Sequence, residues 1–256
     1  MRKVFSIPVF FFCFLVYSQN IDSLRLVLKN AKHDTTRVKT LNYWSLKIFS
    51  SQPDSSLLLC THAKKLAEKN LNIMRVNLSD EEAFFMEYYF RKNLGESALR
   101  IGVLNFNKGK MEAALTALEY SLKIRREMLA KSNTPLERHE SKQGMALSYN
   151  NLGEFYRRKG MMKEAMENYT SSLKIKEGLL KEKLSATEIK QVKITIAYTL
   201  NNIAIIYLNQ GKPDEALAFW FKSMKLNKEL GEKDRLAFNY TNIAGVYSER
   251  GLKKEA

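Results

Sequence analysis

The chain has 256 residues, with 42 Lys and Arg against 27 Asp and Glu, which gives a formal net charge of +15. Its 45% hydrophobic and 27% charged residues exclude a disordered chain and a membrane protein with several spans. Two cysteines and three histidines are too few for a disulfide framework or a four-cysteine zinc site. The length suits one large domain, two small ones or an array of repeats.

Residues 1–18 have the form of a secretory signal peptide. Arg2 and Lys3 precede an apolar run, and Val16 and Ser18 occupy the positions that a signal peptidase reads. The apolar run is shorter than the roughly 20 residues that a membrane-spanning helix needs. We therefore expect cleavage after Ser18 and export to the periplasm or another extracytoplasmic space. A retained N-terminal anchor is the alternative.

Two weaker elements follow. Within residues 19–35, apolar residues recur at helical spacing, and we expect a short amphipathic helix over residues 20–31 that caps the helices after it. Residues 36–78 form a degenerate helical pair, in which Cys60 follows three leucines. A buried, apolar thiol is therefore expected there rather than a nucleophile.

The rest of the chain repeats itself. Four glycines recur at intervals of 51, 51 and 40 residues, and an alanine lies five residues after each. The pairs are Gly109 with Ala114, Gly160 with Ala165, Gly211 with Ala216, and Gly251 with Ala256. Seven residues beyond the first three alanines, Ser121, Ser172 and Ser223 open blocks of the Ser-Leu-Lys-Ile type. This coincidence of spacing and residue type indicates one repeated structural unit.

Each unit contains two amphipathic helices. In the first helix of one unit, Tyr149, Leu152 and Gly153 recur on one face, and the turn glycine supplies the positive φ that ends the helix. Small residues such as Gly153 and Ala165 allow the two helices to approach closely. Tyrosines and Trp220 are expected to fill the space around these contacts.

These recurring residues resemble the tetratricopeptide repeat, whose pattern is a bulky residue, Leu-Gly, Tyr, a turn Gly, Ala, an aromatic residue and a small residue followed by Leu. The best unit carries it as Tyr149, Leu152-Gly153, Tyr156, Gly160, Ala165, Tyr169 and Ser172-Leu173. The resemblance implies an all-α fold, a right-handed α-solenoid of antiparallel helix pairs. The expected units are residues 79–133, 134–184 and 185–230, with an incomplete unit at 231–256.

The period departs from that family, whose unit has about 34 residues. Thr134 and Ser185 open capping boxes, and each lies 26 residues before a turn glycine. We therefore expect first helices of about 24 residues, which take up the additional sequence. A disordered loop of about 17 residues is the alternative.

The last unit stops before a second helix. We expect this to leave Ile243, Val246 and Tyr247 uncovered, and we expect the chain to be the N-terminal part of a longer protein. The signal, the short first helix and the long repeats resemble the extracytoplasmic regions of bacterial sensor histidine kinases and helix-turn-helix regulators. By that resemblance, a membrane helix and an output domain would follow.

Motifs for chemistry are missing. The sequence contains no phosphate-binding loop, no recognisable nucleophilic triad and no metal-ligand spacing. His33, His62 and His139 belong to different units, and residues 80–82 favour a helix start rather than a carboxylate pair. We therefore expect no enzyme activity, no metal and no cofactor for these residues.

The informative polar residues lie on the first helices. In tetratricopeptide arrays this face lines the concave groove, where asparagine binds the backbone of an extended peptide. The resemblance therefore implies these partner-groove candidates: Arg100, Asn150, Asn151, Glu154, Arg157, Arg158, Asn201, Asn202, Asn209 and Asn242. Hydrogen bonding between neighbouring helices is the alternative role for the asparagines.

We expect a non-catalytic solenoid whose partner is a protein or peptide, and the positive charge favours an acidic one. The first interpretation is the sensing or scaffolding part of a signalling protein, and a free-standing periplasmic scaffold is the second. A third, an RNA-binding helical repeat, conflicts with the export signal, so no nucleic acid is expected.

Overall fold

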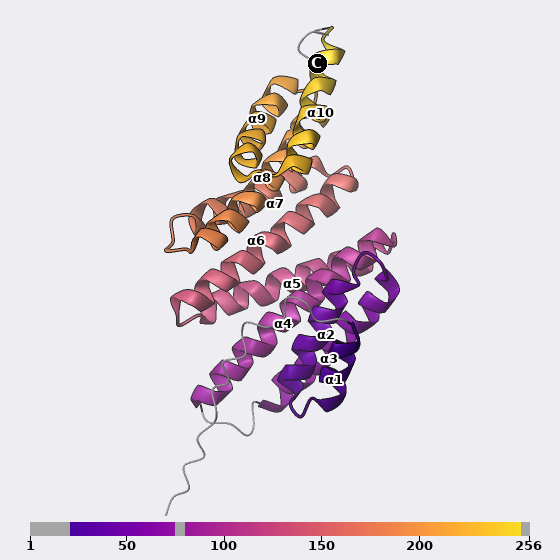
Figure 1. Cartoon of the computed structure of the whole chain (residues 1–256), viewed down its shortest axis with the longest axis vertical. Helices are drawn as coiled ribbons and strands as arrows, with labels where there is room; N and C mark the ends of the chain where they lie inside the picture. The colour runs from indigo at the N-terminus through magenta and orange to yellow at the C-terminus, as the bar shows by residue number, and fades with distance from the viewer. Residues whose placement is uncertain (1–20, 75–79, 252–256) are drawn as a thin grey trace, which may run out of the picture.

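The structure, a computed structural model, describes residues 21–74 and 80–251. Every regular element in these ranges is an α-helix, and the helices stack along the long axis of the molecule (Figure 1). They are α1 (Ile21–Asn30), α2 (Asp34–Lys47), α3 (Pro53–Met74), α4 (Asp80–Asn107), α5 (Met111–Lys131), α6 (Pro135–Arg158), α7 (Met162–Leu179), α8 (Ala186–Asn209), α9 (Pro213–Leu230) and α10 (Lys233–Glu249). The expected all-α solenoid of helix pairs is confirmed. The predicted signal peptide lies outside the described residues.

The helices form pairs, each with a first helix (α2, α4, α6 or α8) and a second helix (α3, α5, α7 or α9), followed by α10. Each second helix also packs on the first helix of the next pair. Neighbouring first helices contact one another from α2 to α8. Because elements on the inner side of a curved stack lie closest together, the first helices line the concave side.

Lengthened helices account for the long period. α6 and α8 each have 24 residues and begin at the expected caps. Thr134 Oγ1 accepts a hydrogen bond from the Glu137 backbone N at 3.1 Å, and the Glu137 carboxylate accepts one from the Thr134 N at 3.2 Å. Ser185 and Glu188 form the same box. The predicted capping boxes are confirmed, and the alternative of a 17-residue disordered loop is wrong.

The turn glycines end the first helices as predicted. Gly109, Gly160 and Gly211 have φ values of 73°, 76° and 70°, a region that residues with a Cβ rarely adopt. In each turn, the backbone N of the residue after the glycine donates to the carbonyl five residues earlier, as in a Schellman motif.

A repeated side-chain hydrogen bond joins the two helices of each long unit. Ser121, Ser172 and Ser223 donate to the carbonyl oxygens of Gly95, Ala146 and Ala197, at 2.8, 2.7 and 2.8 Å. All three serines are buried. The small residues at the accepting positions let the serine approach the backbone of the first helix. The helix spacing is therefore set by the same contact in three successive units.

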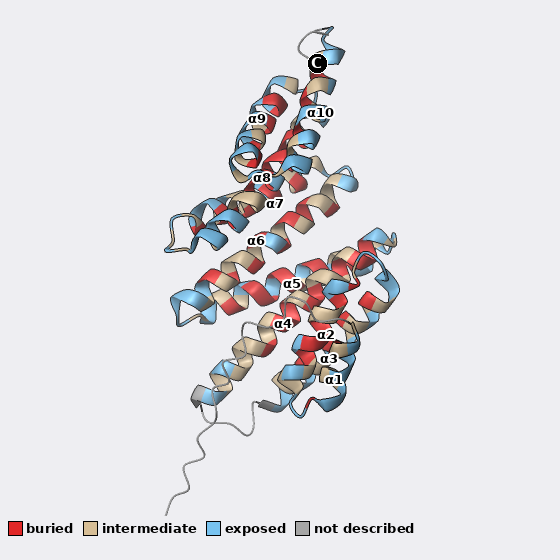
Figure 2. Ribbon diagram, in the orientation of Figure 1, coloured by how far each residue is buried: buried red, intermediate tan, exposed pale blue. Residues whose placement is uncertain are grey.

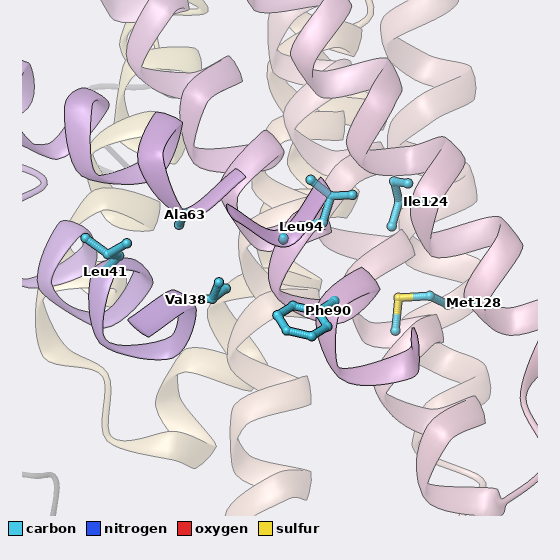
Figure 3. Close-up of a cluster of buried hydrophobic side chains, with 8 residues drawn as sticks. Val38, Leu41, Ala63, Phe90, Leu94, Ile124 and Met128 are labelled. Carbon is cyan, nitrogen blue, oxygen red and sulfur yellow. The ribbon is translucent and has the colours of Figure 1, made fainter. Parts of the chain in front are cut away.

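The core runs between the helices along the whole stack, and the outer faces and turns are exposed (Figure 2). Near the N-terminal end, Val38 of α2, Phe90 of α4 and Met128 of α5 belong to one buried cluster (Figure 3). Trp220 is buried as predicted, with 1% of its surface exposed. Cys60 is also fully buried, and its Sγ lies 2.6 Å from Ser45 Oγ.

The last helix corrects one expectation. Ile243 and Val246 are not uncovered, since they are 6% and 2% exposed and pack in a cluster with Leu217 and Trp220 of α9. Tyr247 is partly buried against the same cluster. The preceding second helix α9 covers this face, just as α3, α5 and α7 pack on the first helices that follow them.

The tight contact at Gly153 is directly testable. A Cβ at this position would lie 2.7 Å from Cδ1 of Tyr169, whose ring is fully buried. We expect Gly153→Ala to lower the free energy of unfolding by about 1–3 kcal/mol, measured by urea denaturation. Gly245→Ala, in the interior of α10 with no atom within 4 Å of the added Cβ, is the control and should raise it by about 0.5–1 kcal/mol. Equal effects of the two changes would contradict the packing argument.

Candidate partner groove

A groove of about 670 Å³ lies on the concave side, between α2, α4 and α6. Its apolar lining comes from Leu46, Phe49, Leu99, Val103 and Leu147. Leu46 of α2 and Leu147 of α6 remain 55% and 44% exposed. We call this cavity the α4–α6 groove. It gathers exposed leucines in a concave site, which is typical of a surface that receives a partner.

Arg125 reaches this groove from the second helix α5. Its side chain passes between Gly95 of α4 and Gly144 of α6. A Cβ added at Gly95 would lie 2.8 Å from Arg125 Nε, and one added at Gly144 would lie 2.6 Å from Arg125 Cδ. Both glycines therefore clear the path of this side chain between the first helices.

The Arg125 guanidinium is buried, with 5% of the residue exposed, and it lacks a strong partner. Its Nε has no hydrogen-bond partner, and its Nη1 contacts Met128 Sδ at 3.9 Å. No ion pair joins Arg125 to a carboxylate in the described ranges, although Glu96 and Glu140 act on it through space. Burial lowers the pKa of the guanidinium below its ordinary value, but arginine remains charged in proteins.

Arg125 belongs to a buried column that the sequence interpretation missed. Arg125, Lys176 and Asn227 each lie 16 residues after a turn glycine and four residues after the recurring serine of their unit. Lys176 Nζ donates to Thr195 O at 3.1 Å and Thr199 Oγ1 at 2.6 Å. Asn227 Nδ2 donates to Asn239 Oδ1 at 2.7 Å. The first helix of the next pair thus supplies hydrogen-bond acceptors to Lys176 and Asn227, but Arg125 Nε has none.

Two of the predicted candidates line the α4–α6 groove. Arg100 Nη1 donates to the Asn42 carbonyl at 3.0 Å, which ties α4 to α2. Asn151 is partly exposed, and its Nδ2 donates to the Leu147 carbonyl one turn earlier at 2.9 Å. The structure therefore brings Arg100 and Asn151 to one site.

The other asparagine candidates lie between helices. Asn150 is buried, and its Oδ1 accepts from Thr199 Oγ1 at 3.0 Å. Asn201 is also buried, and its Oδ1 accepts from Trp220 Nε1 at 2.9 Å and from Asn242 Nδ2 at 3.3 Å. Asn202 is 5% exposed, and its Nδ2 has no hydrogen-bond partner. The hydrogen bonds of Asn150, Asn201 and Asn242 join neighbouring helices, which is the alternative role given above for the asparagines. Contact of these residues with a ligand stays a prediction.

The charged candidates near the end of α6 bind one another. Glu154 accepts from Arg157 Nη2 at 2.8 Å and from Arg158 Nε at 2.6 Å. Burial alone would raise the pKa of Glu154, but the hydrogen bonds from these arginines hold it below its ordinary value. The remaining candidate, Asn209, is exposed at the last residue of α8. The predicted residues thus divide into several places rather than one site.

A second groove, of about 360 Å³, lies between α8, α9 and α10. Tyr198 and Phe238 line it and remain 50% and 57% exposed. Asn201, Asn227 and Asn239 lie on its floor. The charged residues that line this groove, Asp234 and Arg235, are exposed, unlike Arg125.

Two sequence models of the tetratricopeptide repeat match the chain, over residues 146–178 and 195–256. The chain therefore contains tetratricopeptide repeats, as the repeated columns predicted. A comparison with curated protein sequences finds no match.

Solved structures share the fold across most of the chain. The crystal structure of BtubC (BKLC) from P. vanneervenii aligns with a TM-score of 0.52 at 16% identity, over 88% of this chain and 87% of that one. A putative kinesin light chain with nearly identical TPR-like repeats from Podosopora anserina aligns with a TM-score of 0.52 at 15% identity, over 88% of this chain and 92% of that one. At these identities the likeness shows the fold alone. None of the described helices is long and apolar enough to cross a membrane.

The buried Lys176 makes stability depend on pH. Burial lowers the pKa of its ammonium from the ordinary 10.5 to about 7, so between these values the unfolded chain binds a proton that the folded chain does not. Stability therefore rises with pH across this window, and the full penalty applies below pH 7. We expect Lys176→Met to remove that rise and to stabilise the protein at pH 7 by a few kcal/mol.

Urea unfolding from pH 6 to pH 10, followed by circular dichroism, measures this difference. Lys174→Met is the matched control, because Lys174 lies exposed on the same helix. The interpretation fails if both variants keep the slope of the unmodified protein.

Proposed function

We propose that the chain is a non-catalytic interaction solenoid that binds an extended segment of a partner protein in the α4–α6 groove. The observation that carries this proposal is the pair of exposed leucines, Leu46 and Leu147, held in a concave site with polar groups around them. Apolar side chains of a segment would bury these leucines. Groups such as Gln143 and Asn151 are placed to bind its backbone.

The charge of the groove agrees with an acidic segment. Lys92, Arg100 and Arg125 line it against the carboxylates of Glu96 and Glu140. The chain as a whole carries +15, so an acidic partner would be attracted to it in solution. Binding should weaken as the salt concentration rises.

Peptides displayed on phage as a random library test the groove. We expect selected peptides to bind the protein and to lose about 5–20-fold in affinity with Leu147→Gln, because the change removes an apolar contact. The matched control is Leu58→Gln, since Leu58 is 72% exposed but lies on the second helix α3. Fluorescence anisotropy with labelled peptides measures the affinities. Equal affinity for the two variants would place binding outside the groove.

We also propose that the chain is exported through residues 1–18 and acts outside the cytoplasm. In that setting it serves as the sensing or scaffolding part of a signalling protein, or as a periplasmic scaffold. The support is the signal-like pattern of these residues and the resemblance described above.

N-terminal sequencing of the protein from the periplasmic fraction of a Gram-negative host tests the export proposal. We expect the mature chain to begin at Gln19. Val16→Asp should block processing, because a charged residue does not fit the signal-peptidase site. Protein that begins at Met1 in that fraction would overturn cleavage.

A further inference from the structure

We propose that Arg125 binds a carboxylate of the bound segment, namely an Asp or Glu side chain flanked by apolar residues in an extended peptide. This inference rests on the proposed function of the α4–α6 groove and identifies the chemistry of its ligand. Arg125 would be the charged anchor at the floor of the groove, and Leu46 and Leu147 would hold the neighbouring apolar side chains.

Arg125 is a buried cation without a strong hydrogen-bond partner. A buried charge is costly unless it is paired, and a buried guanidinium normally donates to carboxylates in a fork geometry. Here Nε has no partner, and Nη1 meets only the weak acceptor Met128 Sδ. An incoming carboxylate would supply the strong acceptor that Arg125 lacks.

Arg125 differs in its contacts from the residues at the same position of the next two units. Lys176 and Asn227 occupy the positions of Arg125 in the next two units, and each donates to the following first helix. Position 144 of α6 corresponds to Thr195 of α8, 51 residues later, whose carbonyl accepts from Lys176. Thr199, the other acceptor of Lys176, corresponds to Ser148 of α6, whose Oγ donates to Gly144 O at 3.0 Å and lies 3.0 Å from Ser121 Oγ instead. The absence of a Cβ at Gly144 leaves the space that Arg125 occupies where it lines the groove.

The glycines on both sides of Arg125 also support its assignment as a carboxylate-binding residue. Gly95 and Gly144 lie inside helices, where glycine costs about 1 kcal/mol each relative to alanine. In return, the two glycines leave space for the Arg125 side chain to extend from the second helix α5 to the concave face. A core that needed only filling would not require a cation on this path.

The other charged groups at the groove leave Arg125 available. Glu140 already accepts from Lys92 Nζ at 2.7 Å and from Tyr88 at 2.7 Å. Arg100 is directed to the Asn42 carbonyl. Glu96 lines the groove and acts on Arg125 through space, so it competes with an incoming carboxylate. Removing the charge of Glu96 should therefore strengthen the binding of acidic peptides.

A double-mutant cycle tests the assignment. The probes are groove-dependent peptides from the phage selection, made with a free and with an amidated C-terminus, and the amidated peptides with Asp→Asn or Glu→Gln changes. We expect Arg125→Met to weaken the acidic peptides by about 10–100-fold and the amide versions by less than about 3-fold. Glu96→Gln should tighten the acidic peptides by about 2–5-fold.

Arg126→Met is the matched control, because Arg126 is the next residue on α5 but is exposed and donates to Tyr149. It should leave both peptide series unchanged. Circular dichroism checks that each variant is folded. If Arg125→Met does not fold, Arg125→Lys keeps the charge but loses the fork geometry, and it should reduce the preference for the acidic peptide over its amide.

The outcomes separate the two proposals. Peptides that are insensitive to Leu147→Gln overturn the proposed function of the groove. Peptides that are sensitive to Leu147→Gln but lose equal affinity in acidic and amide form with Arg125→Met, or lose none, overturn the carboxylate assignment alone. Binding that disappears when only the C-terminus is amidated assigns the site to a chain-end carboxylate and overturns the side-chain assignment.

Discussion

The close approach of the two helices within each long unit is the constraint on which the rest of the structure depends. A serine hydroxyl of the second helix donates to a carbonyl of the first at 2.7–2.8 Å in three successive units. The accepting residues Gly95, Ala146 and Ala197 are all small, because a larger side chain there would hold the helices apart. The residue one turn beyond each serine, namely Arg125, Lys176 or Asn227, is buried against the next first helix.

That position explains how a repeated fold acquires a local site. Lys176 and Asn227 find acceptors on the next first helix, so they remain part of the interior. Arg125 meets Gly144 instead and extends to the concave face. The candidate site therefore arises from a departure from the repeat, in which one long cation and two glycines replace a satisfied interhelical contact. Repeat architectures permit such changes because each unit contacts only its neighbours.

Local signals predicted the parts of the fold that depend on nearby residues. Thr134 and Ser185 reach only three residues ahead to close their capping boxes, and the turn glycines act through their own φ angles, so both were readable from the sequence. The burial of Ile243 could not be predicted from the sequence, because it depends on how α9 packs over α10. Arg125 was missed although its spacing from Gly109 recurs at Lys176, because a basic residue normally indicates a solvated helix face and the chain has 42 Lys and Arg.

The sequence by itself determined the helical repeats, their caps and turns, and the small residues at which helices meet, because periodicity and backbone preference act over one or two turns. Only the tertiary structure decided which polar side chains face the groove. Asn202 occupies the repeat position of Asn151, 51 residues later, yet it is buried, whereas Asn151 is partly exposed at the groove. Leu46 and Arg125 come from separate units and meet in one cavity. Such convergence depends on how the units stack, which spacing along the chain does not specify.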